Sequence, residues 1–150
     1  MSIQVITYSL EDFTSMSMYN DGNVEDFVSD YFICVNATGN KHSIPYFKHS
    51  HYNVLNMYFD DVYIDCVKYY GPTDSEYQFN AKACTNEQAK EMFDFISTLP
   101  TNIRLHIYCT KGKSRSVAIA KFCDEYLNKT VSTRTGHNGL VYDLLCLNLK

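Results

Sequence analysis

Short runs of apolar, often β-branched residues recur along the chain and predict β-strands. These runs occupy residues 3–7, 31–35, 54–59 and 103–108. The second run lies between Asp30 and the turn-forming stretch 36–40, and the third ends at Asp60 and Asp61, as is typical of strands bounded by turns. The region after the third run is mixed, and we expect a loop there with an additional strand at 62–69.

Apolar residues at helical spacing predict four helices. They lie at 9–18, between Thr85 and Pro100, at 115–127 and at 139–147. The second helix has the clearest start, because Thr85 and Gln88 match a capping box, and Pro100 ends it. The last helix carries leucine and valine on one face, a stripe more typical of core packing than of a partner surface, and we expect Asn138 or His137 to cap it.

Strands and helices therefore alternate along the chain, and this order predicts an α/β fold. We expect a central, mainly parallel, twisted sheet flanked by helices. The chain has 150 residues, enough for one hydrophobic core, and no repeat, low-complexity tract or Pro/Gly-rich linker divides it. We therefore interpret residues 1–150 as a single domain.

Composition and charge argue against several classes of protein. The chain is 45% hydrophobic and 20% charged, which argues against a disordered protein. No stretch approaches the ~18 apolar residues of a membrane span, and the N-terminal segment lacks a secretory leader, so we expect a cytoplasmic protein with no membrane partner. The formal net charge of −4 argues against a globally basic nucleic-acid-binding protein but leaves room for a local basic pocket.

The cysteines and one histidine pair carry less information. The six cysteines are widely spaced without a C-x-x-C pair, and we interpret most of them as free thiols of a reducing cytoplasm. His49 and His51 lack a second close pair of ligands, so we expect no metal site.

The segment 107–116 carries the most informative chemistry. It connects a predicted strand to a predicted helix, so its turn directs backbone N–H groups and the positive end of the helix to one point, which favours an oxyanion such as phosphate. The Arg115 guanidinium can hold two oxygens of such an anion. The Cys109 thiol adjoins the same groups, and we expect it to ionise more readily than a free thiol. Lys111 and Lys113 add positive potential, or are simply solvated turn residues.

The segment reads C-x-x-G-x-x-R-S, with Cys109, Gly112, Arg115 and Ser116 at the defined positions. For this composition the expected chance count of the pattern is roughly 4 × 10⁻⁴. A nucleotide-binding loop of the Walker type is excluded, because Ile107 stands where that motif has glycine. The pattern resembles the signature of the cysteine-dependent protein tyrosine phosphatase superfamily, and its place in the last third of the chain is similar to the compact dual-specificity branch.

The resemblance covers residues 30–147 and implies a role for each signature residue. Cys109 would be the nucleophile, Arg115 the phosphate clamp, and Ser116 the hydroxyl that stabilises the cysteine thiolate when it leaves the phosphoenzyme. Backbone N–H groups would bind the remaining phosphate oxygens. They belong to Thr110, Lys111, Gly112, Lys113, Ser114 and Arg115.

The resemblance also implies a general acid, an aspartate on a loop that protonates the leaving oxygen. By their order after the predicted strand 54–59, Asp61 is the first candidate and Asp60 the second. Asp61 precedes Cys109 by 48 residues. This spacing is longer than in many members of the compact branch, so Asp61 as the acid requires an insertion in the loop. Asp74 is a third candidate, because it lies closer to Cys109 in sequence. The competing interpretation is that all three are solvated turn acids.

One residue departs from the family pattern. The superfamily usually has histidine directly before the cysteine, where it helps to order the loop, and here that residue is Tyr108. Either its hydroxyl donates a comparable hydrogen bond to the loop, or its ring is simply a core aromatic.

The resemblance implies a phosphomonoester hydrolase of the protein tyrosine or dual-specificity type, which acts through a cysteinyl-phosphate intermediate and needs no metal or other cofactor. The expected partner is a phosphorylated protein or another phosphomonoester. One alternative is an enzyme of the same fold that acts on RNA 5′-phosphates, nucleotides or phosphoinositides, with nucleic acid as a substrate only. The others are a phospho-binding module with little catalysis and a structural or interaction protein.

Overall fold

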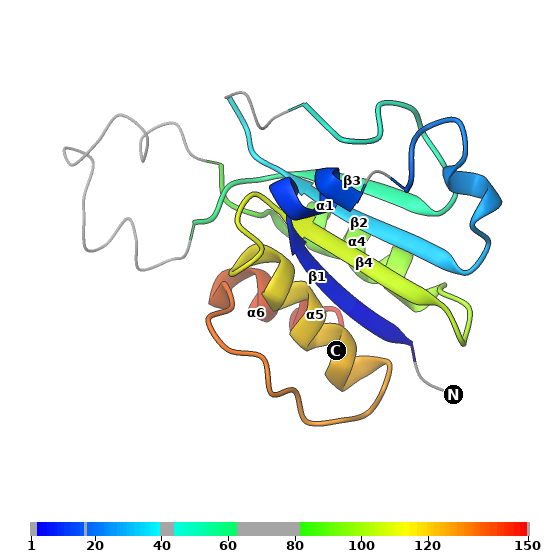
Figure 1. Cartoon of the computed structure of the whole chain (residues 1–150). Coiled ribbons are helices and arrows are strands. Elements are labelled where there is room, and N and C mark those ends of the chain that lie inside the picture. The colour runs from blue at the N-terminus through cyan, green and yellow to red at the C-terminus, as the bar shows by residue number, and fades with distance from the viewer. Residues whose placement is uncertain (1–2, 17, 40–43, 63–81, 150) are drawn as a thin grey trace.

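Four strands and five helical segments make up the part of the chain that the computed structural model describes, namely residues 3–16, 18–39, 44–62 and 82–149. In chain order the elements are β1 (Gln4–Ser9), α1 (Leu10–Met16), the 3-10 helix η1 (Val24–Asp26), β2 (Asp30–Asn36), β3 (Val54–Tyr58), α4 (Asn86–Ser97), β4 (Arg104–Cys109), α5 (Arg115–Tyr126) and α6 (Gly139–Leu147). Figure 1 shows the strands as one sheet with helices on both sides.

The sheet has the strand order β1-β4-β2-β3, and every pairing within it is parallel. The fourth strand in sequence therefore lies between the first and the second, and Cys109 at its end pairs with Ser9 of β1. Because all four strands run in one direction, their carboxyl ends meet at one edge of the sheet. The expected α/β fold with a parallel sheet flanked by helices is confirmed.

The two faces of the sheet bury different kinds of side chain. Along β4, Leu105, Ile107 and Cys109 belong to one hydrophobic cluster, whereas Tyr108 belongs to the other and His106 stacks on its rings. This alternation follows from the two-residue period of a strand.

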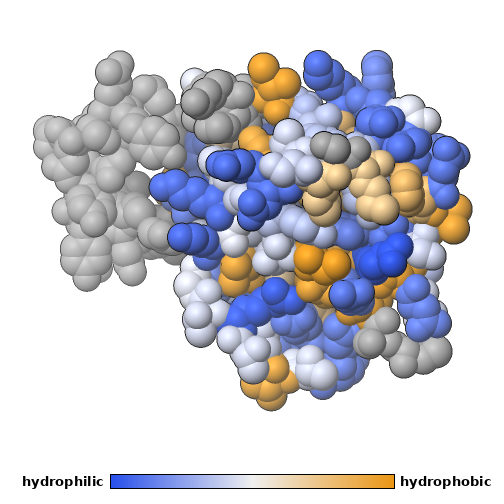
Figure 2. Space-filling view, viewed as in Figure 1, coloured by the Kyte–Doolittle hydropathy of each residue, from blue (hydrophilic) through white to orange (hydrophobic). Residues whose placement is uncertain are grey.

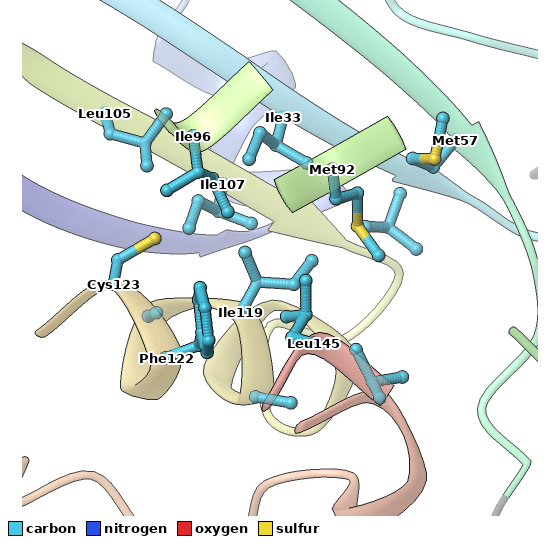
Figure 3. Close-up of a cluster of buried hydrophobic side chains, with 14 of the residues drawn as sticks. Ile33, Met57, Met92, Ile96, Leu105, Ile107, Ile119, Phe122, Cys123 and Leu145 are labelled. Carbon is cyan, nitrogen blue, oxygen red and sulfur yellow. The ribbon is translucent and has the colours of Figure 1, made fainter. Parts of the chain in front are cut away.

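Helices α4, α5 and α6 cover the first face with aliphatic side chains and a few aromatic ones. Their buried contributions, seen in Figure 3, include Met92, Ile96, Ile119, Phe122, Cys123 and Leu145. The second face is aromatic and is covered by α1 and by the chain around η1 and before β3. Its members include Phe13, Tyr19, Phe32, Phe47 and Tyr108. Ring pairs such as Phe13 and Phe32 meet edge to face, a preferred arrangement for aromatic side chains.

On the face seen in Figure 2, hydrophobic patches are small and separated by polar residues. Within the described ranges, no helix combines the length and the apolar character that crossing a membrane requires.

The local signals in the sequence agree closely with the observed elements. The capping box of α4 is present: Thr85 accepts from the Gln88 N–H, and the Gln88 side chain accepts from the Thr85 N–H. Helix α6 has the predicted bounds. The sequence does not predict the short η1, because three residues are too few for a periodic pattern. The expected strand at 62–69 lies outside the described residues, except for Val62, which is not in a strand.

A buried ionic group joins β2, β4 and β1 beneath the aromatic cluster. Asp30 is 1% exposed and accepts from Arg104 at Nε (2.6 Å) and Nη2 (3.0 Å) and from His106 Nε2 at 2.8 Å. Burial alone would raise the pKa of Asp30, but these hydrogen bonds outweigh it and hold the pKa below its ordinary value. Burial lowers the pKa of His106, which leaves the neutral ring to accept at Nδ1 from the Tyr8 hydroxyl at 2.8 Å.

Replacing Asp30 tests how much this group stabilises the fold. The Asp30→Ala variant leaves two donors without an acceptor, one of them fully buried, and we expect it to lose about 3 kcal/mol of unfolding free energy in urea denaturation. Asp94→Ala is the matched control, because its carboxylate pairs with Lys90 on an exposed helix face and should matter little. Equal losses of unfolding free energy in the two variants would contradict a stabilising role for the Asp30 group.

Candidate functional site

The segment that carries the candidate chemistry lies at the carboxyl edge of the sheet. Strand β4 ends at Cys109, residues 110–114 form a turn, and α5 begins at Arg115. As Figure 1 shows, this turn lies next to the ends of β1 and β2 and above the first turn of α5. A helix N-terminus and the end of a central strand therefore meet at one point, an arrangement suited to anion binding.

The turn curls around the sulfur of Cys109. The side chain is 2% exposed, and Sγ accepts from the backbone N–H of Gly112 at 3.2 Å and of Ser116 at 3.5 Å. It also lies 3.2 Å from the Ser116 hydroxyl oxygen. Cys109 is a free thiol. Three polar groups of the turn and of the start of α5 thus converge on one unbridged sulfur.

Glycine at position 112 is required by a close approach to β1. Its φ is +70°, and a Cβ at this position would lie 2.5 Å from the Ser9 nitrogen and 2.6 Å from the Tyr8 carbonyl carbon. The Leu10 N–H donates to the Thr110 oxygen at 3.2 Å, which further joins the turn to the end of β1. The first strand of the chain therefore supports the turn that surrounds the sulfur.

Arg115 is buried and incompletely paired. The residue is 6% exposed, and its Nη1 donates to the Phe59 carbonyl at 2.9 Å. Its Nε is buried and has no hydrogen-bond partner among the described residues. Buried donors are rarely left without an acceptor, and a donor on a cation least of all. An anion beside the guanidinium is the acceptor that would satisfy it.

The two adjacent aspartates after β3 have different surroundings. Asp60 is 2% exposed, and its carboxylate accepts from the backbone N–H of Thr38 at 2.9 Å and of Lys82 at 2.8 Å, as well as from the Thr38 hydroxyl. It is therefore a structural residue that joins three chain segments. Asp61 is half-buried, and its Oδ1 accepts from the Ser114 hydroxyl at 2.8 Å. Asp61 thus contacts the turn, whereas the Asp60 carboxylate is held by Thr38 and Lys82. Asp74 lies outside the described residues.

The remaining turn residues differ in exposure. Lys111 and Lys113 are exposed, while Thr110, Gly112 and Ser114 are half-buried. The lysine side chains are thus at the surface of the turn, where they contribute positive potential near its mouth.

Tyr108 is a core aromatic. It is 1% exposed, its hydroxyl donates to Asn36 Oδ1 at 2.8 Å, and it accepts from the Tyr46 N–H at 3.2 Å. The alternative, a hydrogen bond to the turn, is wrong because alternation along β4 directs Tyr108 to the face opposite Cys109.

The other cysteines and the histidine pair lie elsewhere. Cys34, Cys84, Cys123 and Cys146 are free thiols, and Cys66 lies outside the described residues. Burial raises the pKa of Cys84 to about 12 and that of Cys123 well above its ordinary value, so these thiols stay protonated. His51 lies between Asp21 and Glu25, with ring nitrogens 2.8 and 2.7 Å from their carboxylates. The described ranges contain no cluster of three or more candidate metal ligands.

One site residue is not predicted as such by the sequence. The pattern around Asn138 indicates only a cap for α6, and its side chain does accept from the Val141 N–H at 3.2 Å. The same side chain also donates from Nδ2 to Asp61 Oδ1 at 2.8 Å and to the Val62 carbonyl at 3.2 Å. A cap pattern cannot show these contacts, because 77 residues separate Asn138 from Asp61.

Comparison of the chain with protein-family models, with curated proteins and with solved structures gave no match. The case for a function therefore depends on the geometry of the turn and the residues that touch it.

Replacing Gly112 tests the fit of the turn against β1. We expect Gly112→Ala to destabilise the protein through both its positive φ and the contact of the new Cβ with the Ser9 and Tyr8 backbone. Gly39→Ala is the matched control: its φ is also +70°, but a Cβ there would meet no atom within 4 Å. In urea denaturation, the control should lose about 1–2 kcal/mol of unfolding free energy through backbone strain, and Gly112→Ala should lose clearly more. Equal losses of unfolding free energy would show that the contact between the new Cβ and the β1 backbone has no effect on stability.

Proposed function

We propose that this chain is a cysteine-dependent phosphomonoester hydrolase of the protein tyrosine or dual-specificity phosphatase type. The observation that carries the proposal is the buried Arg115 Nε, without a partner among the described residues, on the turn whose N–H groups surround the Cys109 sulfur. An unsatisfied cationic donor favours a bound oxyanion, and a sulfur among N–H donors favours a nucleophilic thiolate beside it. A phosphate monoester supplies both an anion to bind and a phosphorus atom to attack.

Binding follows from the donors of the turn. The backbone N–H groups from Thr110 to Arg115 and the guanidinium of Arg115 surround the non-bridging oxygens of the phosphate. Arg115 Nη1 is already held by the Phe59 carbonyl, so the plane of the guanidinium is fixed before the substrate arrives. Donors that are fixed in advance stabilise the charge of the transition state without reorganisation.

The first chemical step transfers the phosphoryl group to sulfur. The Cys109 thiolate attacks phosphorus in line, the S–P bond forms, and the bond from phosphorus to the leaving oxygen breaks. Asp61, which contacts the turn through Ser114, gives its proton to that leaving oxygen. The products of this step are the free alcohol or phenol and a cysteinyl-phosphate.

The second step regenerates the enzyme. Water attacks phosphorus and gives a proton to the Asp61 carboxylate, and the S–P bond breaks to release inorganic phosphate. The thiolate leaves with its electron pair, and the Ser116 hydroxyl, 3.2 Å from Sγ, stabilises that charge. The protein ends with the same protonation states with which it began.

The surroundings of the turn favour catalysis over simple phosphate recognition. A binding module needs Arg115 and the backbone N–H groups, but it needs neither a sulfur at the base of the turn nor a carboxylate against it. Both are present, in Cys109 and Asp61. The exposed Lys111 and Lys113 favour substrates with further negative charge, such as an acidic phosphopeptide.

Replacing Cys109 tests the nucleophile. We expect Cys109→Ser to fold as the wild type does and to lose turnover of an aryl phosphate by a factor on the order of 10³ or more, because a hydroxyl at this position is a far weaker nucleophile. Cys146→Ser is the matched control, since this half-buried thiol lies on α6, and it should keep wild-type turnover. Turnover by Cys109→Ser at the wild-type rate would contradict the proposal.

Anion binding tests Arg115 separately from chemistry. Tungstate or inorganic phosphate should raise the melting temperature of the wild type and of Cys109→Ser, because both keep the anion site. Arg115→Lys should lose most of that shift, since an ammonium cannot reproduce the planar, two-point donor geometry. An undiminished shift in Arg115→Lys would show that the anion binds elsewhere.

A further inference from the structure

Asn138 connects three parts of the candidate site from one buried position. The residue is 0% exposed and directly precedes α6. Its backbone N–H donates to the Ser114 carbonyl at 3.1 Å, and its side-chain oxygen accepts from the Val141 N–H. Its side-chain amide donates to Asp61 and to the Val62 carbonyl. The turn, the start of α6 and the segment after β3 therefore meet at this residue.

The two donors that reach Asp61 arrive at the same oxygen. The Ser114 hydroxyl and the Asn138 amide both donate to Oδ1, each at 2.8 Å. Two donors occupy both acceptor positions of a carboxyl oxygen. No hydrogen bond to Oδ2 is present among the described residues, so Oδ2 is the oxygen that can carry a proton and pass it on.

From this geometry we propose that Asn138 is a positioning residue for the acid step: it holds Asp61 Oδ1 so that Oδ2 delivers the proton to the leaving group. The inference rests on the proposed function, because it takes Asp61 as the general acid. Asn138 itself touches neither the substrate nor the reacting atoms in this mechanism. Its contribution is to remove the freedom of the Asp61 side chain relative to the turn, to which Ser114 and the Asn138 backbone are both joined.

A purely structural role would not require asparagine here. Serine, threonine or aspartate caps a helix about as well through a side-chain oxygen. Asparagine differs because it presents an acceptor to α6 and, at the same time, two amide hydrogens to Asp61 and Val62. The amide donor therefore holds Asp61, whereas the side-chain oxygen only caps α6.

The test separates the cap from the donor. Asn138→Ser and Asn138→Thr both keep an N-cap oxygen, and both lose the amide donor to Asp61. Activity is measured on phenyl phosphate, whose leaving group needs a proton, and on dinitrophenyl phosphate, whose leaving group departs as a stable anion. We expect kcat/KM, which reports only the first chemical step, to fall on the order of 10-fold for phenyl phosphate and to change little for dinitrophenyl phosphate. Melting temperatures of all variants are recorded alongside.

Asp61→Asn supplies the reference pattern, with a larger loss of kcat/KM on phenyl phosphate and little loss of kcat/KM on dinitrophenyl phosphate. The double variant Asn138→Ser/Asp61→Asn should have the same kcat/KM as Asp61→Asn alone. If Asn138 acts only through Asp61, its replacement has no further effect once the Asp61 carboxyl group is absent. Additive losses of kcat/KM in the double variant, or equal losses on both substrates in Asn138→Ser and Asn138→Thr, would overturn the role of Asn138.

The outcomes also distinguish the inference from the function on which it depends. If Asp61→Asn shows the leaving-group dependence and neither Asn138 variant does, the inference fails and the proposed function stands. If Asp61→Asn shows no such dependence, or if Cys109→Ser keeps full activity, the proposed chemistry fails and the inference fails with it. Should Asn138→Ser not fold, Asn138→Thr carries the same comparison, because threonine also caps a helix through its side-chain oxygen.

Discussion

The alternation of side chains along β4 is the constraint on which the candidate site depends. This strand lies between β1 and β2, and its last residue, Cys109, points to the face covered by α5. A shift of one residue in the strand would direct Tyr108 to that face and bury the thiol among aromatic rings. The register of a central strand therefore decides whether the sulfur meets the N–H groups at the start of a helix.

The turn after β4 combines features that do not favour stability on their own. Gly112 adopts a positive φ against the backbone of β1, and Arg115 is buried with a donor that lacks a partner among the described residues. Such features persist where surrounding packing over-determines them, and here α5 supplies that packing, with Ala118, Ile119 and Phe122 each at most 1% exposed. The helix–sheet core thus holds this turn in place although Arg115 Nε lacks a hydrogen-bond partner among the described residues.

Local sequence signals predict much of the fold but only part of the site. Periodicity and the Thr85 capping box indicate the elements, because these signals depend on neighbours within a few residues. The Cys109-to-Ser116 segment is recognisable for the same reason. The partners of Asp60, and the side-chain bond from Asn138 to Asp61, join segments more than twenty residues apart, and no local pattern encodes such contacts. The face to which Tyr108 points becomes clear only from the register of the sheet.

Asp60 and Asp61 are adjacent and chemically identical, but their side chains have different hydrogen-bond partners. The Asp60 carboxylate is enclosed by donors from Thr38 and Lys82, so these interactions serve to anchor the chain that leaves β3. That anchor fixes the backbone from which Asp61 reaches the turn. If Asp61 is the general acid that we propose, this anchor lowers the entropic cost of holding its side chain at the turn. In the proposed mechanism, the buried Asp60 would therefore support the chemistry of its neighbour without taking part in it.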